Sequence, residues 1–395
     1  MAPHLFGGEQ SIMKNFLFLI LFMGISASVY AEDECQEGFL TQYLNSAIAS
    51  QMKKTDSISA SKKIKYSRKL TDYVTPPVFG GYVIGKYGYS SQEDLAISNS
   101  FQARMVRMYV SGYLLRDFKY RVQMEFKDTP SMRDYTLEWL RFKEFQVKFG
   151  QFKRCFTYEN PANPWDIGFG DYSQMTKRFT ALASADPSGE PAQNGRDQGL
   201  QFSGDLFPVG KDGHRLIRYQ LAVYNGSGQN RKENDNKKDW MGNIQIQPVK
   251  NLYVALFGWT GSYTANGVTA IRKRWTLSAQ YNWNDWDFIG EYGHHTGRNL
   301  NNYDANTGIW GGPDAADGWY VKVGIPCTPW LKTWIKYDVY REDATWNTAR
   351  SVFSICPNAQ LHKNLKFQLQ YNYVHDKTAQ DRNYHELWAQ AYVRF

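Results

Sequence analysis

The chain has 395 residues, of which 42% are hydrophobic, 16% aromatic and 21% charged, with a formal net charge of +8. So many aromatic residues with so few charges exclude a disordered chain, and 14 scattered prolines exclude collagen. Four cysteines exclude a dense disulfide framework, and no CxxC or HExxH pair indicates a metal site, so the sequence predicts no metal and no cofactor.

The first predicted element is a secretion signal at the start of the chain. Residues 15–31 carry no charge and follow a lysine, and their apolar core of about ten residues is too short to span a bilayer as a helix. Val29 and Ala31 provide small or medium-sized side chains at the two positions that a signal peptidase recognises before its cleavage site. We therefore expect residues 1–31 to be removed, with Met13 as the start of the signal. The alternative, a retained signal anchor, needs a longer apolar run.

Residues 32–77 are predicted to form a periplasmic N-terminal segment that is partly helical. Between residues 36 and 54, apolar residues recur at spacings of three and four, as on one face of a helix, and a basic stretch follows. One helix of this length is marginal alone. Three roles stay open: packing under the mouth of the barrel predicted below, a short coiled coil between copies, or a loose tether.

Residues 78–395 are predicted to form the strands of a membrane barrel. Beyond the signal, no apolar run reaches the roughly 18 to 20 residues of a membrane helix. Residues 118–127 instead alternate strictly between apolar and polar or charged side chains, and the pattern recurs along the chain. Aromatic residues gather near the strand ends, which indicates girdles at two lipid interfaces and not a soluble sandwich. We expect sixteen strands, at residues 80–89, 101–111, 117–127, 135–142, 145–153, 196–204, 215–224, 240–247, 251–260, 272–282, 286–293, 318–325, 330–340, 350–356, 365–374 and 385–395.

The connections between these strands alternate in length, as in barrels with short periplasmic turns and longer outer loops. Loops are expected at residues 154–195, 225–239 and 261–271, among others. An even strand number puts both termini on the short-turn side, and the last strand ends on Phe395, a pattern typical of outer-membrane barrels. The prediction is an all-β fold, a 16-stranded antiparallel transmembrane β-barrel with a short helical N-terminal periplasmic segment. Its expected location is the outer membrane of a Gram-negative bacterium, with N- and C-termini periplasmic.

The barrel portion, from about residue 78 to 395, resembles the porin O/P family, the phosphate-selective porins of Gram-negative outer membranes. The resemblance rests on an ordered set of short stretches at residues 147–153, 196–204, 223–228 and 368–374. These stretches are moderately specific as a set and weak singly. The resemblance implies a sixteen-stranded channel, usually trimeric, with the third outer loop folded into the pore. Phosphate specificity does not carry over with it, because the family's individual phosphate ligands cannot be matched onto positions of this chain.

The inward face of the predicted strands carries more bases than acids. The bases expected to line the pore are Lys119, Arg121, Lys127, Lys148, Arg218, Arg274, Lys322, Lys336 and Lys366, with Lys332 and Arg394 on the same face. The acids on this face are Glu125, Asp287, Glu291, Asp338 and Glu386. A surplus of lysine and arginine in a confined aqueous lumen favours anions over cations. The alternative is that salt bridges between neighbours neutralise much of this charge.

The connection at residues 154–195 is too long for a structureless loop unless it packs somewhere or has a function. Folded into the lumen, it would bury its aromatic residues and narrow the pore. The residues expected at this constriction are Arg154, Trp165, Tyr172, Lys177 and Arg178. Acidic residues in the same segment offset its bases, so we expect it to constrict the pore without strongly selecting ions.

Catalytic chemistry is not indicated by the sequence. The histidines near strand ends lack a Ser or Cys nucleophile in a recognisable elbow such as GxSxG. We therefore expect a porin for passive diffusion of small, phosphate-like anions through a water-filled lumen, with no enzyme activity. The expected partners are small anionic solutes, outer-membrane lipid and lipopolysaccharide, and further copies of the chain in a homotrimer, but no nucleic acid. The alternative is a plugged structural or receptor barrel used for surface contact or assembly.

Overall fold

The structure, a computed structural model, describes residues 74–93 and 95–395. The predicted signal, the start at Met13 and the predicted helix at residues 36–54 lie outside the described residues. Within the described ranges, no helix is both long enough and apolar enough to cross a membrane.

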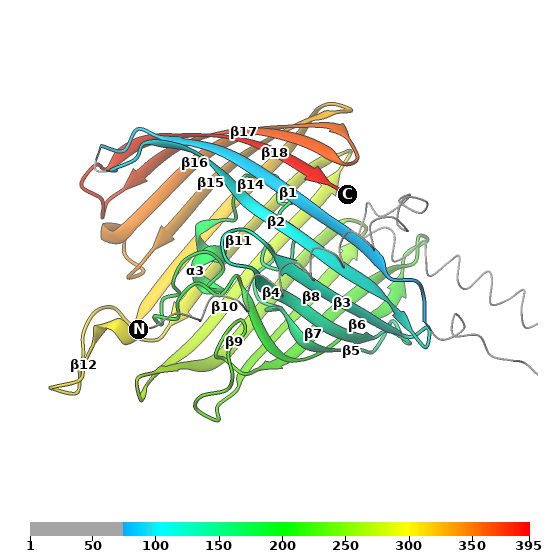
Figure 1. The fold of residues 1–395 in the computed structure, drawn as a ribbon, viewed down its shortest axis with the longest axis horizontal. Coiled ribbons are helices and arrows are strands. Elements are labelled where there is room, and N and C mark those ends of the chain that lie inside the picture. Colours follow the sequence, from blue (N-terminus) through cyan, green and yellow to red (C-terminus); the bar gives the residue numbers. More distant parts are fainter. Residues whose placement is uncertain (1–73, 94) are drawn as a thin grey trace, which may run out of the picture. The chain divides into compact units, whose positions relative to one another are not determined.

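Sixteen strands of the described chain close into one antiparallel barrel, in which the first strand pairs with the last. Figure 1 shows the closure where the blue β1 lies beside the red β18. The barrel strands are β1 (Val78–Ser90), β2 (Asn99–Leu114), β3 (Phe118–Glu125), β4 (Ser131–Trp139), β5 (Gln146–Lys153), β6 (Arg196–Val209), β7 (His214–Tyr224), β8 (Asp239–Val249), β9 (Leu252–Ala265), β10 (Val268–Trp283), β11 (Trp286–Thr296), β14 (Ala315–Thr328), β15 (Leu331–Arg341), β16 (Ala349–His362), β17 (Leu365–Asp376) and β18 (Asn383–Arg394). The predicted sixteen-stranded barrel is confirmed, with strand ends shifted by a few residues.

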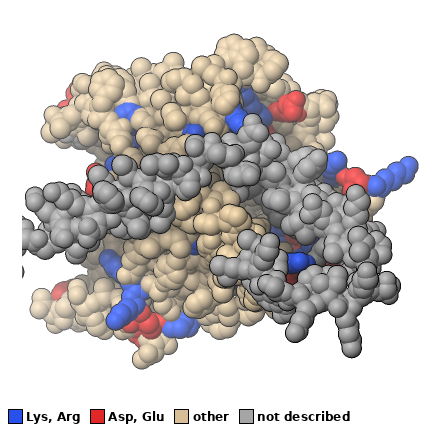
Figure 2. Space-filling view, turned by 45° about the vertical axis from the view of Figure 1, so that its right-hand side comes forward, with Lys and Arg blue, Asp and Glu red and all other residues tan. Residues whose placement is uncertain are grey.

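The strands form because apolar and polar side chains alternate along them, so that each strand has one face outside the barrel and one inside. In β10, Trp275 and Leu277 point outward and are 44% and 50% exposed, whereas Arg274 and Thr276 point inward and are buried. Figure 2 shows one side of the outer surface, where uncharged residues dominate the part that is drawn in colour and charged side chains lie mainly toward its margins. This apolar exterior is the surface that a barrel in a membrane presents to lipid.

One predicted connection, the loop at residues 261–271, is wrong. Strand β9 continues to Ala265 and β10 begins at Val268, so that only Asn266 and Gly267 form the turn. Both have positive φ, 51° and 78°, a conformation that Asn and Gly adopt more readily than other residues. Asn-Gly is a strong signal for a two-residue hairpin, and the flanking residues belong to the strands.

Two further differences concern the ends of strands and the outer loops. Strand β3 ends at Glu125, so Lys127 lies in the β3–β4 loop, where it is 3.8 Å from the carboxylate of Asp128. The loop between β11 and β14 contains a small hairpin of β12 (Tyr303–Asp304) and β13 (Ile309–Trp310), and its yellow strand β12 projects from the barrel in Figure 1.

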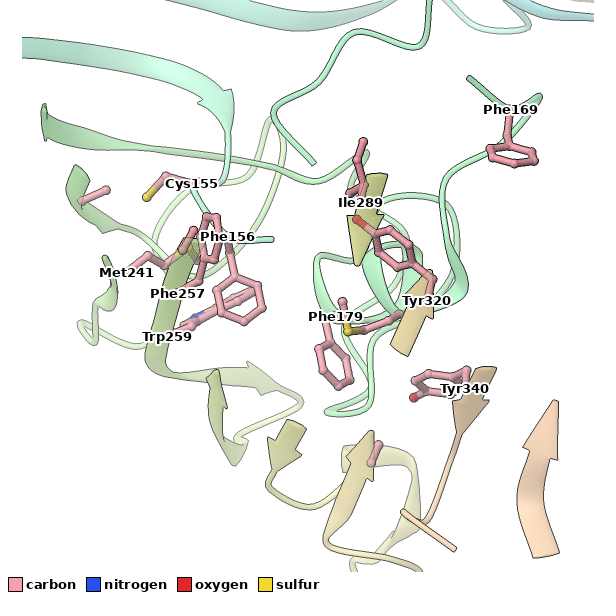
Figure 3. Packing of buried hydrophobic residues seen from close by; sticks show 14 of the residues in the cluster. Cys155, Phe156, Phe169, Phe179, Met241, Phe257, Trp259, Ile289, Tyr320 and Tyr340 are labelled. Atoms are coloured by element: carbon pink, nitrogen blue, oxygen red, sulfur yellow. The ribbon is translucent and has the colours of Figure 1, made fainter. Parts of the chain in front are cut away.

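The connection between β5 and β6, residues 154–195, folds into the barrel interior and is called the inner loop from here on. It contains the short helix α3 (Gln174–Phe179), which lies against β14 and β15. Figure 3 shows Phe156 of the inner loop lying against Phe257 and Trp259 of β9, and Phe179 facing Tyr340 of β15. The largest apolar cluster of the described chain therefore lies inside the barrel, between the inner loop and the wall.

Candidate functional site in the barrel interior

Three buried arginines anchor the inner loop to one side of the wall. Arg272 and Arg274 point inward from β10, and Arg154 is the first residue of the inner loop; all three side chains are fully buried. Asp186 of the inner loop accepts a hydrogen bond from Arg274 at 2.5 Å. Glu190 accepts from Arg272 at 2.5 Å and from Arg154 at 2.7 Å. We call these five residues, together with the wall acids Asp197 and Asp239, the arginine cluster.

Wall residues complete the arginine cluster. Arg154 donates to Asp197 of β6 at 2.9 Å, and Arg272 donates to Asp239 of β8 at 2.6 Å. The indole of Trp259 lies beside all three guanidinium groups, with its ring centre 5.0, 4.9 and 4.3 Å from them. Four buried carboxylates thus surround three buried arginines, so the arginine cluster contributes no free positive charge to the lumen.

Two of the arginines favour the ionised form of the Asp186 carboxyl group. Burial alone raises its pKa, but the guanidinium groups of Arg274 and Arg272 lower the pKa by more, so it lies below the ordinary value of 3.8. Its second oxygen accepts from the backbone N–H groups of Ser188 and Glu190, both at 2.9 Å. Removal of one partner from a buried ion pair costs about 3 to 5 kcal/mol. The arginine cluster therefore holds this part of the inner loop firmly on the wall.

A second group of ion pairs, the lysine anchor, joins the inner loop to β14 and β15. Lys322 donates to Glu159 at 2.7 Å, and both side chains are 3% exposed. Burial raises the pKa of Glu159, but the ammonium groups of Lys322 and Lys336 lower it by more, so it lies below 4.5. Asp338 pairs with Lys336 at 3.3 Å and accepts from the backbone N–H of Gln174, the first residue of α3, at 3.0 Å. Two acids and two bases balance each other here.

The middle of the inner loop reaches the strands where the barrel closes. The backbone carbonyl of Trp165 accepts from Lys366 of β17, and the indole packs edge-on against the inward tyrosine of β18. Asp171 pairs with Lys177 of the same loop at 2.8 Å and lies 3.9 Å from Arg104 of β2. Burial raises the pKa of Asp171, but the charges of Lys177 and Arg104 lower it by more, to about 2.

The inward face of β3, β4 and β5, called the open wall from here on, carries bases that keep part of their surface in water. Lys119, Arg121 and Lys148 are all partly exposed. Lys148 pairs with Glu138 at 3.1 Å, with 29% and 19% of the two side chains exposed, and Lys119 is the register partner of the same glutamate. Among the described residues, no hydrogen bond or ion pair joins Lys119 or Lys148 to the inner loop. Two lysines therefore lie beside one acid.

The excess of bases continues at the other end of the open wall. Arg107 of β2 and Arg133 of β4 both pair with the carboxylate of Glu125, at 2.7 and 3.7 Å. Asp134 of β4 pairs with Arg196 at 2.8 Å. Among residues 74–93 and 95–395, the bases around the open wall outnumber the acids, whereas the arginine cluster and the lysine anchor have at least as many acids as bases.

The structure places the lumen bases predicted from the sequence in different surroundings. Those on the open wall are Lys119, Arg121 and Lys148. Those beneath the inner loop, each at most 4% exposed, are Arg274, Lys322, Lys336 and Lys366. Arg218 pairs with Asp205 at 2.7 Å near the β6–β7 turn and is 57% exposed, and Lys127 lies beyond the end of β3.

The residues predicted at the constriction all lie within the inner loop, but their exposure differs. Arg154 belongs to the arginine cluster, and Trp165 and Tyr172 are 7% and 3% exposed. Lys177 and Arg178, in the last turn of α3, keep 23% and 33% of their side chains exposed. Only these two can present charge to a solute.

Two inward bases that contact the inner loop, Arg272 and Arg104, are not among the predicted lumen bases. Arg272 lies two positions before Arg274, so the alternation alone would have placed it on the inward face. Arg104 is harder to find, because the β1–β2 register shifts beside Gly85 and leaves Arg104 as the extra residue of a bulge. No group of three or more His, Cys, Asp or Glu side chains is arranged to hold a metal ion within residues 74–93 and 95–395.

Comparisons with known proteins agree with this architecture. The family model of the phosphate-selective porins O and P matches residues 84–279, from within β1 to within β10. No curated protein sequence matches the chain significantly. The anion-selective porin from Comamonas acidovorans superposes with a TM-score of 0.62 at 12% identity, covering 81% of this chain and 99% of that one.

Two other solved structures have the same fold. The outer membrane channel DcaP of Acinetobacter baumannii gives a TM-score of 0.58 at 11% identity, covering 81% of this chain and 97% of its own. The trimer form of OmpT, an outer membrane protein of Vibrio cholerae, gives 0.56 at 12% identity, with 81% and 99% covered. At these identities the structural matches establish the fold alone.

Proposed function

Because the chain belongs to the family of the phosphate-selective porins O and P and has the barrel fold of outer-membrane porins, we propose that it lets small anions diffuse passively along its open wall. The coarser part of this statement follows from the family and the fold: the protein is a porin of the Gram-negative outer membrane, a channel and not an enzyme. The finer part, the preference for small phosphate-like anions, rests on the charges of the interior.

One observation carries the anion preference, namely the charge balance of the open wall. Lys119 and Lys148 lie beside the single carboxylate of Glu138, and both lysines remain partly exposed, as does Arg121. Partly hydrated bases in a confined lumen raise the local concentration of anions and lower that of cations. Ammonium and guanidinium groups also bind phosphate oxygens well, which suits anions of phosphate's size and charge.

Planar-bilayer recording tests the anion preference directly. In a KCl gradient we expect a reversal potential close to that of chloride, and phosphate or pyrophosphate should reduce the chloride current where a neutral sugar does not. A reversal potential closer to the equilibrium potential of potassium than to that of chloride would contradict the charge argument, even though the barrel is established.

The inner loop is proposed to constrict this pathway. It is attached to the wall at the arginine cluster, at the lysine anchor and near the barrel closure. Deletion of residues 159–190 should raise the single-channel conductance and leave the barrel folded, because the strand pairing does not include these residues. Unchanged conductance would place the inner loop away from the ion path.

A plugged barrel remains the second candidate, and one contact favours it. The ion pair between Asp171 and Arg104 joins the inner loop to β2, on the far side from its attachment to β10. If the inner loop closed the lumen, well-folded protein would show no conductance for any ion. Such a result would favour a structural or receptor role.

We also propose that three copies associate, with N- and C-termini on the periplasmic side. The outward surface of β1, β2 and β15–β18 has a shallow depression of about 810 Å³, lined in part by Ala103, Ala359, Ala389 and Ala391. We call it the alanine-rich face; its small side chains allow the backbones of two barrels to approach closely. Native gels of chemically cross-linked protein should show a trimer, and a large residue in place of Ala389 should convert it to monomer.

A further inference from the structure

The outer surface of the barrel carries a groove that diffusion through the lumen does not use. The groove lies on the outward face of β8, β9 and β10 and has a volume of about 460 Å³. Its floor includes Gly242 and Gly258, which are register partners on β8 and β9. A Cβ atom added to Gly258 would meet nothing within 4 Å, so the groove is open at this point.

Apolar side chains form the sides of this groove. Leu221 and Trp240 lie on one side and Trp275 on the other, and they are 49%, 53% and 44% exposed. The neighbouring outward register pair of β8 and β9 is Ile244 with Leu256, so that large apolar side chains stand next to the two glycines. The groove is therefore a local gap in an otherwise continuous apolar surface.

Lys273 lies at the end of the groove that is nearer the outer loops. It is two positions from Trp275 on β10, it is exposed, and in the described part of the chain it forms no ion pair. Thr260, its register partner on β9, adds a hydroxyl group beside it. A cation without a partner above an apolar groove is complementary to a molecule with an apolar chain and an anionic head.

The depth of the groove matches the boundary between lipid tails and headgroups. Two pairs of outward aromatic rings lie beside the groove, Trp275 with Tyr292 on β10 and β11 and Trp319 with Tyr337 on β14 and β15, and the ring centres within each pair are 5.4 Å apart. Such aromatic rings mark the membrane interface in outer-membrane barrels. Lys273 lies one outward position beyond Trp275, toward the outer loops, and hence at the level of the headgroups.

The groove also lies away from the surface proposed for contacts between copies. Strands β8–β10 are on the opposite side of the barrel from the pairing of β1 with β18, which is part of the alanine-rich face. We propose that the groove binds lipid A, the phosphorylated glycolipid of the outer leaflet. One acyl chain lies along Gly242 and Gly258, and a phosphate group binds Lys273.

Native mass spectrometry of the detergent-folded full chain tests this site with bisphosphorylated lipid A and with its dephosphorylated form. The wild-type protein should retain one molecule of the bisphosphorylated lipid and bind the dephosphorylated one more weakly. Lys273→Gln should weaken retention about fivefold, the contribution of one lysine beside an anionic lipid surface. Gly258→Leu, which fills the groove, should abolish retention.

Gly290→Leu is the matched control, because Gly290 is an outward glycine of β11 outside the groove, and a Cβ there has its nearest neighbour at 3.7 Å. It should bind as the wild type does. Heat-modifiable migration on gels verifies that each variant is folded, and Lys273→Gln decides the matter if Gly258→Leu fails to fold. Equal retention by the wild type and Lys273→Gln, or by both forms of lipid A, would overturn the proposal. Conductance plays no part in this readout, so its outcome is separate from that of the porin proposal.

Discussion

The open wall and the arginine cluster use the same residue types in opposite ways. On the open wall, Lys119 and Lys148 lie beside Glu138, and these two lysines and Arg121 stay partly exposed. In the arginine cluster, three fully buried arginines contact four carboxylates that are at most 1% exposed. The first arrangement leaves positive charge in the lumen, and the second fixes a loop to the wall.

This difference shows that counting the charges on the inward face of a barrel is not enough to predict its selectivity. A base that is removed from water needs partners that repay its desolvation, so a buried base with carboxylates around it is a structural anchor. A base that stays hydrated has weaker local partners, and its field reaches a passing ion. Exposure and partners therefore decide which lysines and arginines act on the solute.

The largest effect is expected when the arginine cluster loses Arg272. Arg272→Met keeps most of the volume but leaves Asp186, Glu190 and Asp239 without one of their buried cations. Loss of one partner from a buried ion pair costs about 3 to 5 kcal/mol, enough to release this part of the inner loop. We expect a larger and noisier single-channel conductance, and faster proteolysis within residues 154–195 of the folded barrel.

Arg218→Met is the control for that variant. Arg218 also pairs with an aspartate through two hydrogen bonds, at 2.7 and 3.0 Å from Asp205, but its side chain is 57% exposed, and in the described part of the chain no ion pair joins it to the inner loop. Exposed ion pairs contribute little. Its conductance trace should match the wild type, and a quiet, unchanged trace from Arg272→Met would refute the anchoring role of the arginine cluster.

A smaller effect of the same kind is expected at Lys366. Its ammonium group is 4% exposed and donates to the backbone carbonyl of Trp165, so it anchors the loop without facing the solute. Lys366→Met should weaken this attachment by about 1.5 to 3 kcal/mol, the usual range for a hydrogen bond to a charged group. Channel noise should rise while the reversal potential in a KCl gradient stays the same. A clear change in reversal potential would mean that a buried base acts on permeating ions.

The converse result is expected from the open wall. Replacing Lys119, Arg121 and Lys148 together by Gln keeps the polar face and the strand pairing, so the barrel and the inner loop should stay folded. The anion-to-cation permeability ratio should fall by a factor on the order of three at 0.01 M salt, where the Debye length is about 30 Å, and by much less at 1 M. The measurement is the reversal potential at both salt concentrations, and an unchanged ratio at low salt would remove the open wall from the ion path.

The fold could be predicted from the sequence because lipid and lumen impose a strict two-residue period on each strand. The exception is at residues 261–271, where the sequence predicts a loop but Asn266 and Gly267 form a two-residue hairpin turn, for which an Asn-Gly pair is a strong signal. The length of residues 154–195 indicated only that this connection packs somewhere or has a function. Its position inside the barrel was implied by the resemblance to the porin O/P family.

The roles of individual bases could not be predicted in the same way. Arg274 and Lys148 look alike in the alternation, yet Arg274 is fully paired with Asp186, which lies 88 residues earlier in the chain. Such pairing depends on how the inner loop folds in three dimensions, and no local pattern reports it. The bulge at Arg104 similarly depends on the pairing of β1 with β2. The sequence therefore located the charges but not their partners.

The smallest expected effect is a response to acid at the far attachment of the inner loop. The pKa of Asp171 is held at about 2, below the ordinary 3.8, because Lys177 and Arg104 outweigh the effect of burial. A depressed pKa means that the ionised carboxylate stabilises the attachment above about pH 4, and that this contribution is lost as the pH falls toward 2. Channel noise should therefore rise gradually between pH 4 and pH 2.

Asp171→Asn separates this attachment from the other acids of the inner loop. The pKa values of Asp186 and Glu159 are also lowered, so part of the acid response belongs to the arginine cluster and the lysine anchor. The variant should be slightly noisier than the wild type at pH 7, because the carboxylate is absent at every pH, and its noise should increase less between pH 4 and pH 2. If the two proteins showed the same noise at pH 7 and the same rise in acid, the contact between Asp171 and Arg104 would have no part in holding the inner loop. The attachments at β10 and β14 would then be sufficient.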